Sequence, residues 1–224
     1  MKRIVNHWYD LNLIVAIIII IEIIINKTIL NFPQRLILFE FAFYNLHLFE
    51  AFGHPGDMAG TLNVAMYHND KSPTSYPFNQ LSVIICGYLF GIIIWGIPLV
   101  IPQWHWLTLS AVLWGIIEFG LHLFYYPHRT RSSLSSGILT AMLGFLPCGL
   151  IYLAYIWQQD QFSIIGALIA LIYPIAWDWI IFRILGAKFL SNRHPKFPFT
   201  TKQLVRYVKI IKEHPLHHHE PNEF

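Results

Sequence analysis

Residues 104–126, WHWLTLSAVLWGIIEFGLHLFYY, decide the fold class of this chain. A helix needs about 20 mainly apolar residues to cross a lipid bilayer, and this run is long enough. Aromatic side chains stand at both of its ends, with Trp104 and Trp106 at one and Tyr125 and Tyr126 at the other. Such aromatic ends are typical of helices that meet the membrane interface. The stretch therefore predicts a membrane-spanning helix.

The composition of the whole chain agrees with this prediction. Of the 224 residues, 55% are hydrophobic and only 12% are charged, whereas soluble domains carry about 25% charged residues. Such a chain cannot cover a surface that faces water, so the lipid bilayer is its expected partner. The formal net charge of +3 is modest, and the basic residues gather near the C-terminus. This pattern favours anionic lipid head groups over nucleic acid, which we do not expect to bind.

Apolar runs recur along the chain and predict about six transmembrane helices: 11–30, 34–52, 80–101, 104–126, 134–157 and 162–186. The first run has no small-residue cleavage site after it, so we expect an uncleaved helix. The second is the least hydrophobic. The predicted fold is all-α, a polytopic membrane helix bundle formed by residues 1–190.

The distribution of basic residues predicts the orientation of the bundle. Loops that carry Lys and Arg tend to stay in the cytoplasm. With the N-terminus inside, all of the 15 Lys and Arg residues except Lys27 and Arg35 lie on the cytoplasmic side. We therefore expect a multi-pass protein of the cell membrane with both termini cytoplasmic.

Residues 191–224 form a predicted cytoplasmic basic tail. An amphipathic helix is expected from Thr200 or Thr201 to about His214, lying on the lipid head groups. Its apolar stripe and basic face are formed by Leu204, Val208 and Ile211 and by Lys202, Arg206, Lys209 and Lys212. The run His217-His218-His219 is interpreted as a solvated tail segment.

Two pairs of ionisable residues lie within the predicted helices: His47 with Glu50, and Glu118 with His122. Residues three or four apart share a helix face, so each pair can point at one place. Ionisable groups at membrane depth are costly and usually line the bundle interior. The predicted topology sets both pairs near the inner ends of their helices. Because imidazole and carboxylate suit zinc or iron, we predict that these four residues bind a divalent metal ion.

The loop of residues 53–79, on the same predicted side, adds candidates for catalysis. His68 or Asp57 is expected to act as a base or as an extra ligand, and His54 is a further possible ligand. Glu50 is the third candidate catalytic residue. Asp178, in the last predicted helix, is either a carboxylate of the site or the partner of Arg183.

Simpler readings of the same residues stay open. Glu50 could pair with Arg129 or Arg131 at the membrane edge, and the two imidazoles could be neutral and bonded to backbone carbonyls. The acids and histidines could also form a proton relay in a small transporter, or belong to an immunity-type factor. A membrane anchor whose basic tail recruits a partner is a third possibility.

The stretch YNLHLFEAFGHPG at residues 44–56 resembles the opening signature of the HXXEE-domain bacterial membrane proteins. A second similarity follows in His122, in residues 135–141 and in the helix proline Pro147. By this resemblance, His47 and Glu50 match the family's first His and first Glu. Ala51 departs from the pattern, because the family has a second Glu there. Either the site has one carboxylate fewer, or Glu118 replaces the missing acid.

These observations together predict a membrane-embedded, metal-dependent enzyme, either a hydrolase or an oxidoreductase. A centre framed by apolar helices favours a lipid-like or amphiphilic small molecule as substrate. The resemblance implies a membrane protein with a metal site and names no reaction.

Overall fold

The computed structural model describes residues 2–69 and 71–204, and within them every regular element is helical. The elements are α1 (Lys2–Asn6), α2 (Trp8–Ile25), α3 (Phe32–Phe52), α4 (Met58–Gly60), η1 (Thr61–Met66), α5 (Gln80–Gly91), η2 (Ile92–Gly96), α6 (Ile97–Val100), α7 (His105–Gly120), η3 (Leu121–Tyr125), α8 (Tyr126–Thr130), α9 (Ile138–Thr140), η4 (Ala141–Phe145), α10 (Leu146–Gln158), α11 (Ile164–Asp178), η5 (Trp179–Phe189) and η6 (Thr201–Leu204). The labels η1 to η5 are π-helical stretches that mostly continue an α-helix, and η6 is a short 3₁₀ turn. The predicted all-α class is confirmed for the described part of the chain.

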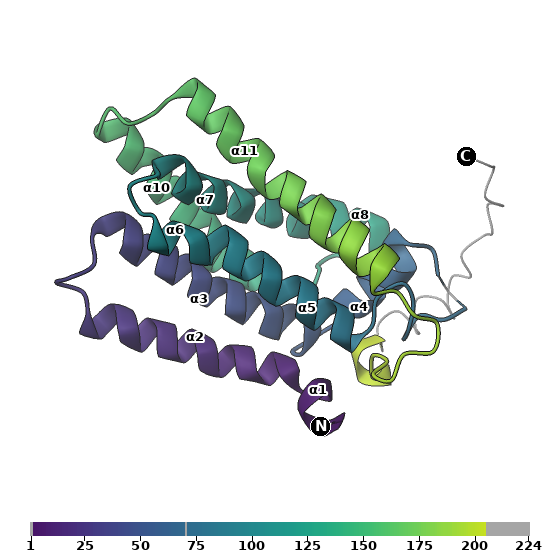
Figure 1. Ribbon diagram of the computed structural model, residues 1–224. Helices are drawn as coiled ribbons and strands as arrows, with labels where there is room; N and C mark the ends of the chain where they lie inside the picture. The colour runs from purple at the N-terminus through teal and green to yellow at the C-terminus, as the bar shows by residue number, and fades with distance from the viewer. Residues whose placement is uncertain (1, 70, 205–224) are drawn as a thin grey trace.

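Five helices are long and apolar enough to cross a membrane: Trp8–Ile25, Gln80–Val100, His105–Thr130, Ile138–Gln158 and Ile164–Phe189. Figure 1 shows them as a bundle of long, roughly aligned helices. Each corresponds to one of the apolar runs in the sequence. The sixth expected span, 34–52, forms the helix α3 but is not among these five, because its polar residues lower its hydropathy. Its membrane crossing stays a prediction.

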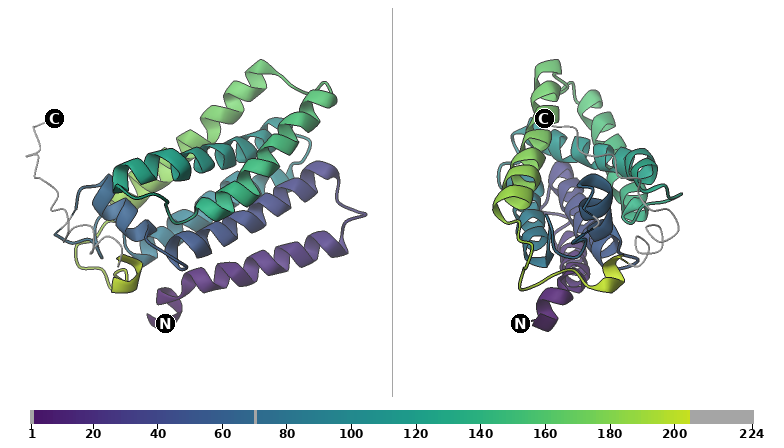
Figure 2. Two further views of the ribbon diagram at one scale, coloured as in Figure 1. Left: turned by 180° about the vertical axis from the view of Figure 1, so that it is seen from behind. Right: turned by 90° about the vertical axis from the view of Figure 1, so that its right-hand side faces the viewer.

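The helix α3 lies in the middle of the bundle (Figure 2). It packs against α2, α5, α7 and α10. Its start is fixed by a capping box, in which the Asn31 side chain accepts from Gln34 N and the Gln34 side chain accepts from Asn31 N. Both of these bonds satisfy N–H groups that a helix start leaves unpaired. The helix with the most polar side chains is thus enclosed by apolar neighbours.

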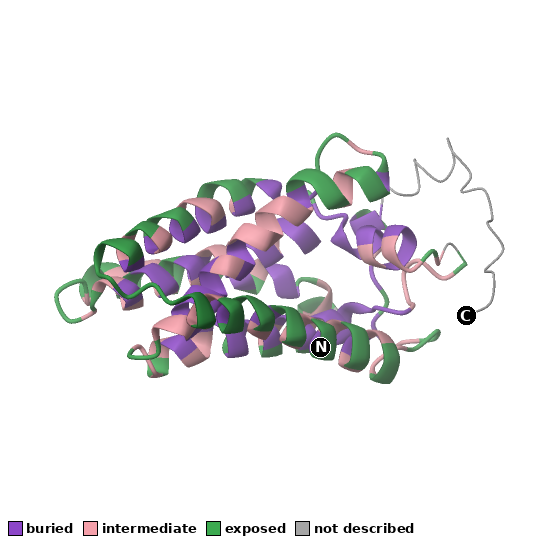
Figure 3. Ribbon diagram, turned by 90° about the horizontal axis from the view of Figure 1, so that it is seen from above, coloured by how far each residue is buried: buried purple, intermediate pink, exposed green. Residues whose placement is uncertain are grey.

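Exposed residues run along the outer faces of the helices (Figure 3), and many of them are large and apolar. In α2 these include Ile14, Ile18 and Ile21, and in α11 Ile165 and Leu168. Soluble monomers rarely expose contiguous apolar surface of this extent. The arrangement fits helices whose outward faces meet lipid.

A segment that follows η5 folds back over one end of the bundle. Gln203 donates from Nε2 to the Phe52 carbonyl and accepts from Gln80 Nε2. Leu204, predicted on the lipid-facing stripe of a tail helix, is instead buried against the bundle at 2% exposure. The described residues 201–204 form the turn η6, and the remainder of the predicted amphipathic helix and the His217–His219 run lie outside the described residues.

Candidate metal centre

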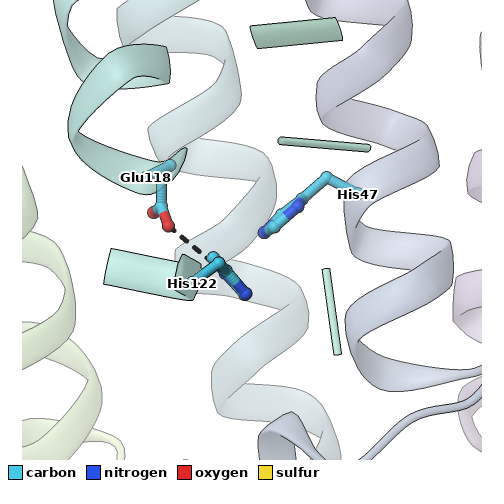
Figure 4. Close-up of side chains that lie close together, drawn as sticks. All are labelled: His47, Glu118 and His122. Carbon is cyan, nitrogen blue, oxygen red and sulfur yellow. Dashed lines mark ion pairs between the residues drawn. The ribbon is translucent and has the colours of Figure 1, made fainter. Parts of the chain in front are cut away.

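Three of the four predicted ligands meet in the structure. His47 comes from α3, Glu118 from α7 and His122 from η3, and one ligand atom of each lies within 4.8 Å of the others. The Nε2 atom of His122 lies 3.5 Å from Glu118 Oε2. The two imidazole rings are perpendicular, with centroids 4.7 Å apart. Figure 4 shows the ring of His47 reaching across from its helix toward the other two side chains.

The ring of His122 is fully buried and held by Ser135. The Ser135 hydroxyl lies 2.8 Å from the His122 backbone carbonyl and 2.9 Å from the ring Nδ1, and both contacts are hydrogen bonds when the hydroxyl donates to the carbonyl and accepts from Nδ1–H. The proton of the neutral imidazole therefore sits on Nδ1. Nε2, the other ring nitrogen, is buried and has no hydrogen-bond partner in the described structure. Its charged neighbour is Glu118 Oε2 at 3.5 Å, a carboxylate oxygen that cannot satisfy a nitrogen lone pair, whereas a bound ion would.

The ring of His47 is held in the same way by Thr140. The Thr140 hydroxyl lies 2.7 Å from Glu50 Oε2 and 3.0 Å from the Gly137 carbonyl oxygen, and both of these atoms accept. The hydroxyl gives its proton to one of them and therefore accepts from His47 Nδ1–H at 3.0 Å. This leaves Nε2 of His47 with its lone pair toward the centre.

Glu50 is not a member of the three-residue group. Its two carboxylate oxygens accept from Leu139 N at 3.2 Å and from Thr140 N at 2.9 Å, at the start of α9. A carboxylate is well placed at a helix start, where backbone N–H groups are unpaired. Glu50 thus reaches the centre only through Thr140 and His47, and the carboxylate of the group comes from Glu118.

A glycine allows the two imidazoles to approach each other. Gly137 has a φ of +100°, and a Cβ atom there would lie 2.5 Å from Cε1 of both His47 and His122. The backbone at Gly137 therefore packs directly against both rings. No other residue type fits this position without moving them.

The distances within the group suit a metal of ordinary size. Four ligands at about 2.1 Å in a tetrahedron lie roughly 3.4 Å from one another. The separation of 3.5 Å between His122 Nε2 and Glu118 Oε2 already matches this value. The remaining separations, at most 4.8 Å, need small inward rotations of the side chains.

A cavity of about 130 Å³ adjoins the centre. Its polar lining comes from His47, Glu118, His122, Tyr44, Tyr67, Tyr126, Asp178 and Arg183. The rest of the wall is apolar and largely aromatic. Ala51, where the HXXEE pattern has its second Glu, also lines this cavity.

The other predicted site residues lie elsewhere. His68 accepts from Arg129 at 3.1 Å and lines a separate open pocket of about 660 Å³. Asp57 is the residue before α4, with a φ of +85°, and does not line the cavity. His54 pairs with Asp10 at 3.5 Å. Both readings of Asp178 have support, because Asp178 lines the cavity and the charge of Arg183, which lines it too, acts on the Asp178 carboxyl group.

Thr140, Ser135 and Gly137 were not predicted as parts of the centre. Thr140 lies 93 residues from His47 in sequence, and no helical spacing links the two. In the sequence, only the HXXEE resemblance draws attention to the segment that contains these three residues, and that resemblance assigns no role to any of them. The alternative pairing of Glu50 with Arg129 or Arg131 is not seen among the described residues, since Arg129 bonds Ala65 and His68.

The chain matches no protein-family model, no curated protein and no solved structure. The side chains of the centre and their contacts are therefore what points to a function. The resemblance to the HXXEE-domain proteins stays a prediction.

Proposed function

We propose that this chain is a membrane-embedded, metal-dependent enzyme whose metal ligands are His47, Glu118 and His122. One observation carries the proposal: a hydroxyl group holds Nδ1 of each imidazole and leaves the second nitrogen available to the centre. Imidazoles that bind a metal in proteins almost always donate their other N–H to a neighbouring acceptor, which fixes the ring.

The ligand set points to zinc or iron. Two imidazoles and one carboxylate suit both ions. Three protein ligands leave one coordination position open, as in catalytic rather than structural sites. A divalent ion held there would lower the pKa of a bound water towards about 7 and so supply a nucleophile.

Hydrolysis is the reaction that the surroundings favour. Asp178 lines the same cavity as the three ligands, so a second carboxylate is available to accept a proton from the attacking water. The loop residue His68 is less suited, because it is bonded to Arg129 in another pocket. Iron in place of zinc would point instead to an oxidoreductase, since two His and one carboxylate also form oxygen-activating iron sites.

The proposed substrate is a lipid-like or amphiphilic small molecule. The centre lies among helices that are apolar enough to cross a membrane, and the cavity wall is mainly apolar. In this proposal the protein lies in the cell membrane with both termini in the cytoplasm. The HXXEE resemblance supports the same class of protein.

Metal analysis of the protein purified in mild detergent tests the proposal. We expect about one zinc or iron per chain in the wild type, and loss of that metal in His47→Ala, Glu118→Ala and His122→Ala. His54→Ala is the matched control, because this imidazole pairs with Asp10 away from the centre. A wild-type metal content no higher than that of the His47→Ala/His122→Ala double variant would contradict the proposal.

A proton-coupled transporter is the second candidate, and Glu40 favours it. This carboxyl group is fully buried on α3, two turns before His47. Its Oε2 accepts from Trp95 Nε1 at 3.0 Å, and its Oε1 has no hydrogen-bond partner in the described structure. Buried acids and histidines along one helix are typical of proton pathways. Proton uptake into liposomes that persists after chelation, and is lost in Glu40→Gln, would select the transporter.

A further inference from the structure

The cavity beside the proposed metal centre carries two polar groups that the centre does not use. The guanidinium group of Arg183 lies over the ring of Tyr67, 5.2 Å from its centroid. Within residues 2–69 and 71–204, it makes no ion pair and no hydrogen bond. The hydroxyl of Tyr67 is buried and likewise has no partner there. Both side chains line the cavity. Arg183 is exposed and its charge also acts on Asp178, so two donors that make no hydrogen bond among the described residues lie along the cavity wall.

These donors suit an anion. Arg offers a planar fork of N–H groups that matches a carboxylate or a phosphate, and a phenol O–H adds a further donor. The two acids of the cavity, Glu118 and Asp178, would balance a divalent ion in the centre. Arg183 then leaves one positive charge that attracts an anionic head group, whether a carboxylate or a phosphate monoester.

The rest of the wall is suited to hydrocarbon. Leu48, Met58, Phe78, Phe90 and Phe182 are among the residues that line the cavity. At about 130 Å³ it is smaller than the roughly 300–1,000 Å³ of typical small-molecule sites. Only a head group and the first atoms of a chain fit inside. A longer apolar chain has to extend out of the cavity.

We propose that Arg183 and Tyr67 bind the anionic head group of an amphiphilic substrate and that the aromatic wall holds the start of its apolar chain. This proposal rests on the proposed function and narrows its substrate class to an anionic amphiphile, carrying a phosphate monoester or a carboxylate. Arg183 has the role of a binding residue, since it contacts none of the three metal ligands.

Calorimetric binding of hexyl phosphate tests the proposal, with the full chain loaded with metal in nanodiscs of neutral lipid. We expect Arg183→Gln to weaken binding by about tenfold to a hundredfold, because a charged hydrogen-bonding partner is lost. Arg183→Lys keeps the charge without the fork and should lose less. Arg131→Gln, which removes an exposed cation from the separate pocket beside α8, is the matched control and should bind as the wild type does.

Two further ligands separate the sources of affinity. Inorganic phosphate should bind at least about tenfold more weakly than hexyl phosphate, because it gains nothing from the apolar wall. Hexyl glucoside, which is uncharged, should show no dependence on Arg183. Equal binding of the two phosphates, or equal binding of hexyl phosphate by wild type and Arg183→Gln, overturns the proposal.

Metal content distinguishes this failure from failure of the proposed function. Arg183→Gln should retain the metal of the wild type, since its side chain lies outside the ligand group. A metal-loaded wild type without Arg183-dependent binding refutes the anion site alone. A wild type without metal refutes the proposed enzyme, whatever the binding shows.

Discussion

Two hydroxyl groups determine which nitrogen of each imidazole faces the centre. The Ser135 hydroxyl donates its proton to the His122 carbonyl, and the Thr140 hydroxyl donates its proton to Glu50. Each hydroxyl oxygen can then accept a hydrogen bond from the Nδ1–H group of an imidazole. The Nε2 lone pairs of His47 and His122 are thereby directed away from these hydroxyls. Glu50 does not contact the imidazole of His47 but positions Thr140. Its carboxylate accepts hydrogen bonds from both the backbone N–H and the hydroxyl of Thr140.

Removing the Thr140 hydroxyl should weaken metal binding. Thr140→Val keeps the shape of the side chain but takes away the acceptor of His47 Nδ1–H and a donor to Glu50. Losing such an outer hydrogen bond typically costs about tenfold to a hundredfold in metal affinity. Competition titration with a chelating dye measures the change in the dissociation constant for zinc.

Thr130→Val is the control for this substitution. The Thr130 hydroxyl bonds Ser132 at 2.7 Å and contacts neither imidazole. Its removal should leave the zinc affinity unchanged. A Thr140→Val protein that binds zinc as tightly as the wild type would show that the hydroxyl does not orient His47.

At the scale of the elements, the centre depends on how closely α9 approaches α3 and η3. The approach is set at Gly137, which precedes α9 and packs against both imidazoles. Its φ of +100° is favourable only for glycine. The Glu50 carboxylate then ties the start of α9 to α3.

Gly137→Ala should disrupt the centre. The new Cβ atom would lie 2.5 Å from each ring and the backbone would be strained, so we expect a loss of at least about 1–2 kcal/mol in stability. Metal binding should be lost as the rings move apart. Thermal unfolding in detergent and metal analysis provide the two measurements.

Gly120→Ala is a close control, since Gly120 lies two residues before His122. A Cβ atom there meets nothing within 4 Å, and the helix favours alanine. This variant should keep both its metal and its thermal stability. If Gly137→Ala behaved like Gly120→Ala, the close packing of α9 against the imidazoles would be wrong.

The elements differ in how far the sequence predicts them. Long apolar runs gave five helices, because hydrophobic length alone selects them. The spacing of four residues predicts that Glu118 and His122 share one helix face. The predicted topology sets His47 at the same membrane depth, which predicts that it lies near them. The contact of α3 with α9 could not be predicted, because it joins residues about 90 apart through a threonine and a glycine that carry no periodic signal. The sequence predicts Glu50 as a ligand because its neighbours in the chain give no sign that its carboxylate binds the backbone N–H groups at the start of α9.

At the scale of the whole molecule, the bundle has two chemically different ends. Lys27 lies in the connection between α2 and α3 and Arg35 near the start of α3, at the end opposite to the N-terminus and η6 (Figure 1). At the other end, the Arg129 guanidinium bonds the Ala65 carbonyl and Arg193 lies over the ring of Tyr76. Five helices of the described residues meet the hydropathy expected of a span, and α3 also traverses the bundle. The N-terminus and η6 therefore lie at the same end.

The uneven charge predicts that the end with η6 faces the cytoplasm. Single cysteines in a chain without Cys86 and Cys148 test this, since both native thiols are buried. Thr28→Cys lies at the α2–α3 connection and Ser133→Cys between α8 and α9, and both positions are exposed. A membrane-impermeant maleimide should label Thr28→Cys in intact cells and Ser133→Cys only after lysis.

The opposite labelling pattern would reverse the orientation, and labelling of both cysteines in intact cells would show that the bundle does not separate its two ends across a membrane.

The orientation matters for the chemistry, because His47 lies near the C-terminal end of α3, toward η6. With that end inside, the cavity lies at the level of the inner leaflet. An anionic amphiphile would then reach Arg183 from the leaflet in which anionic lipids are most abundant.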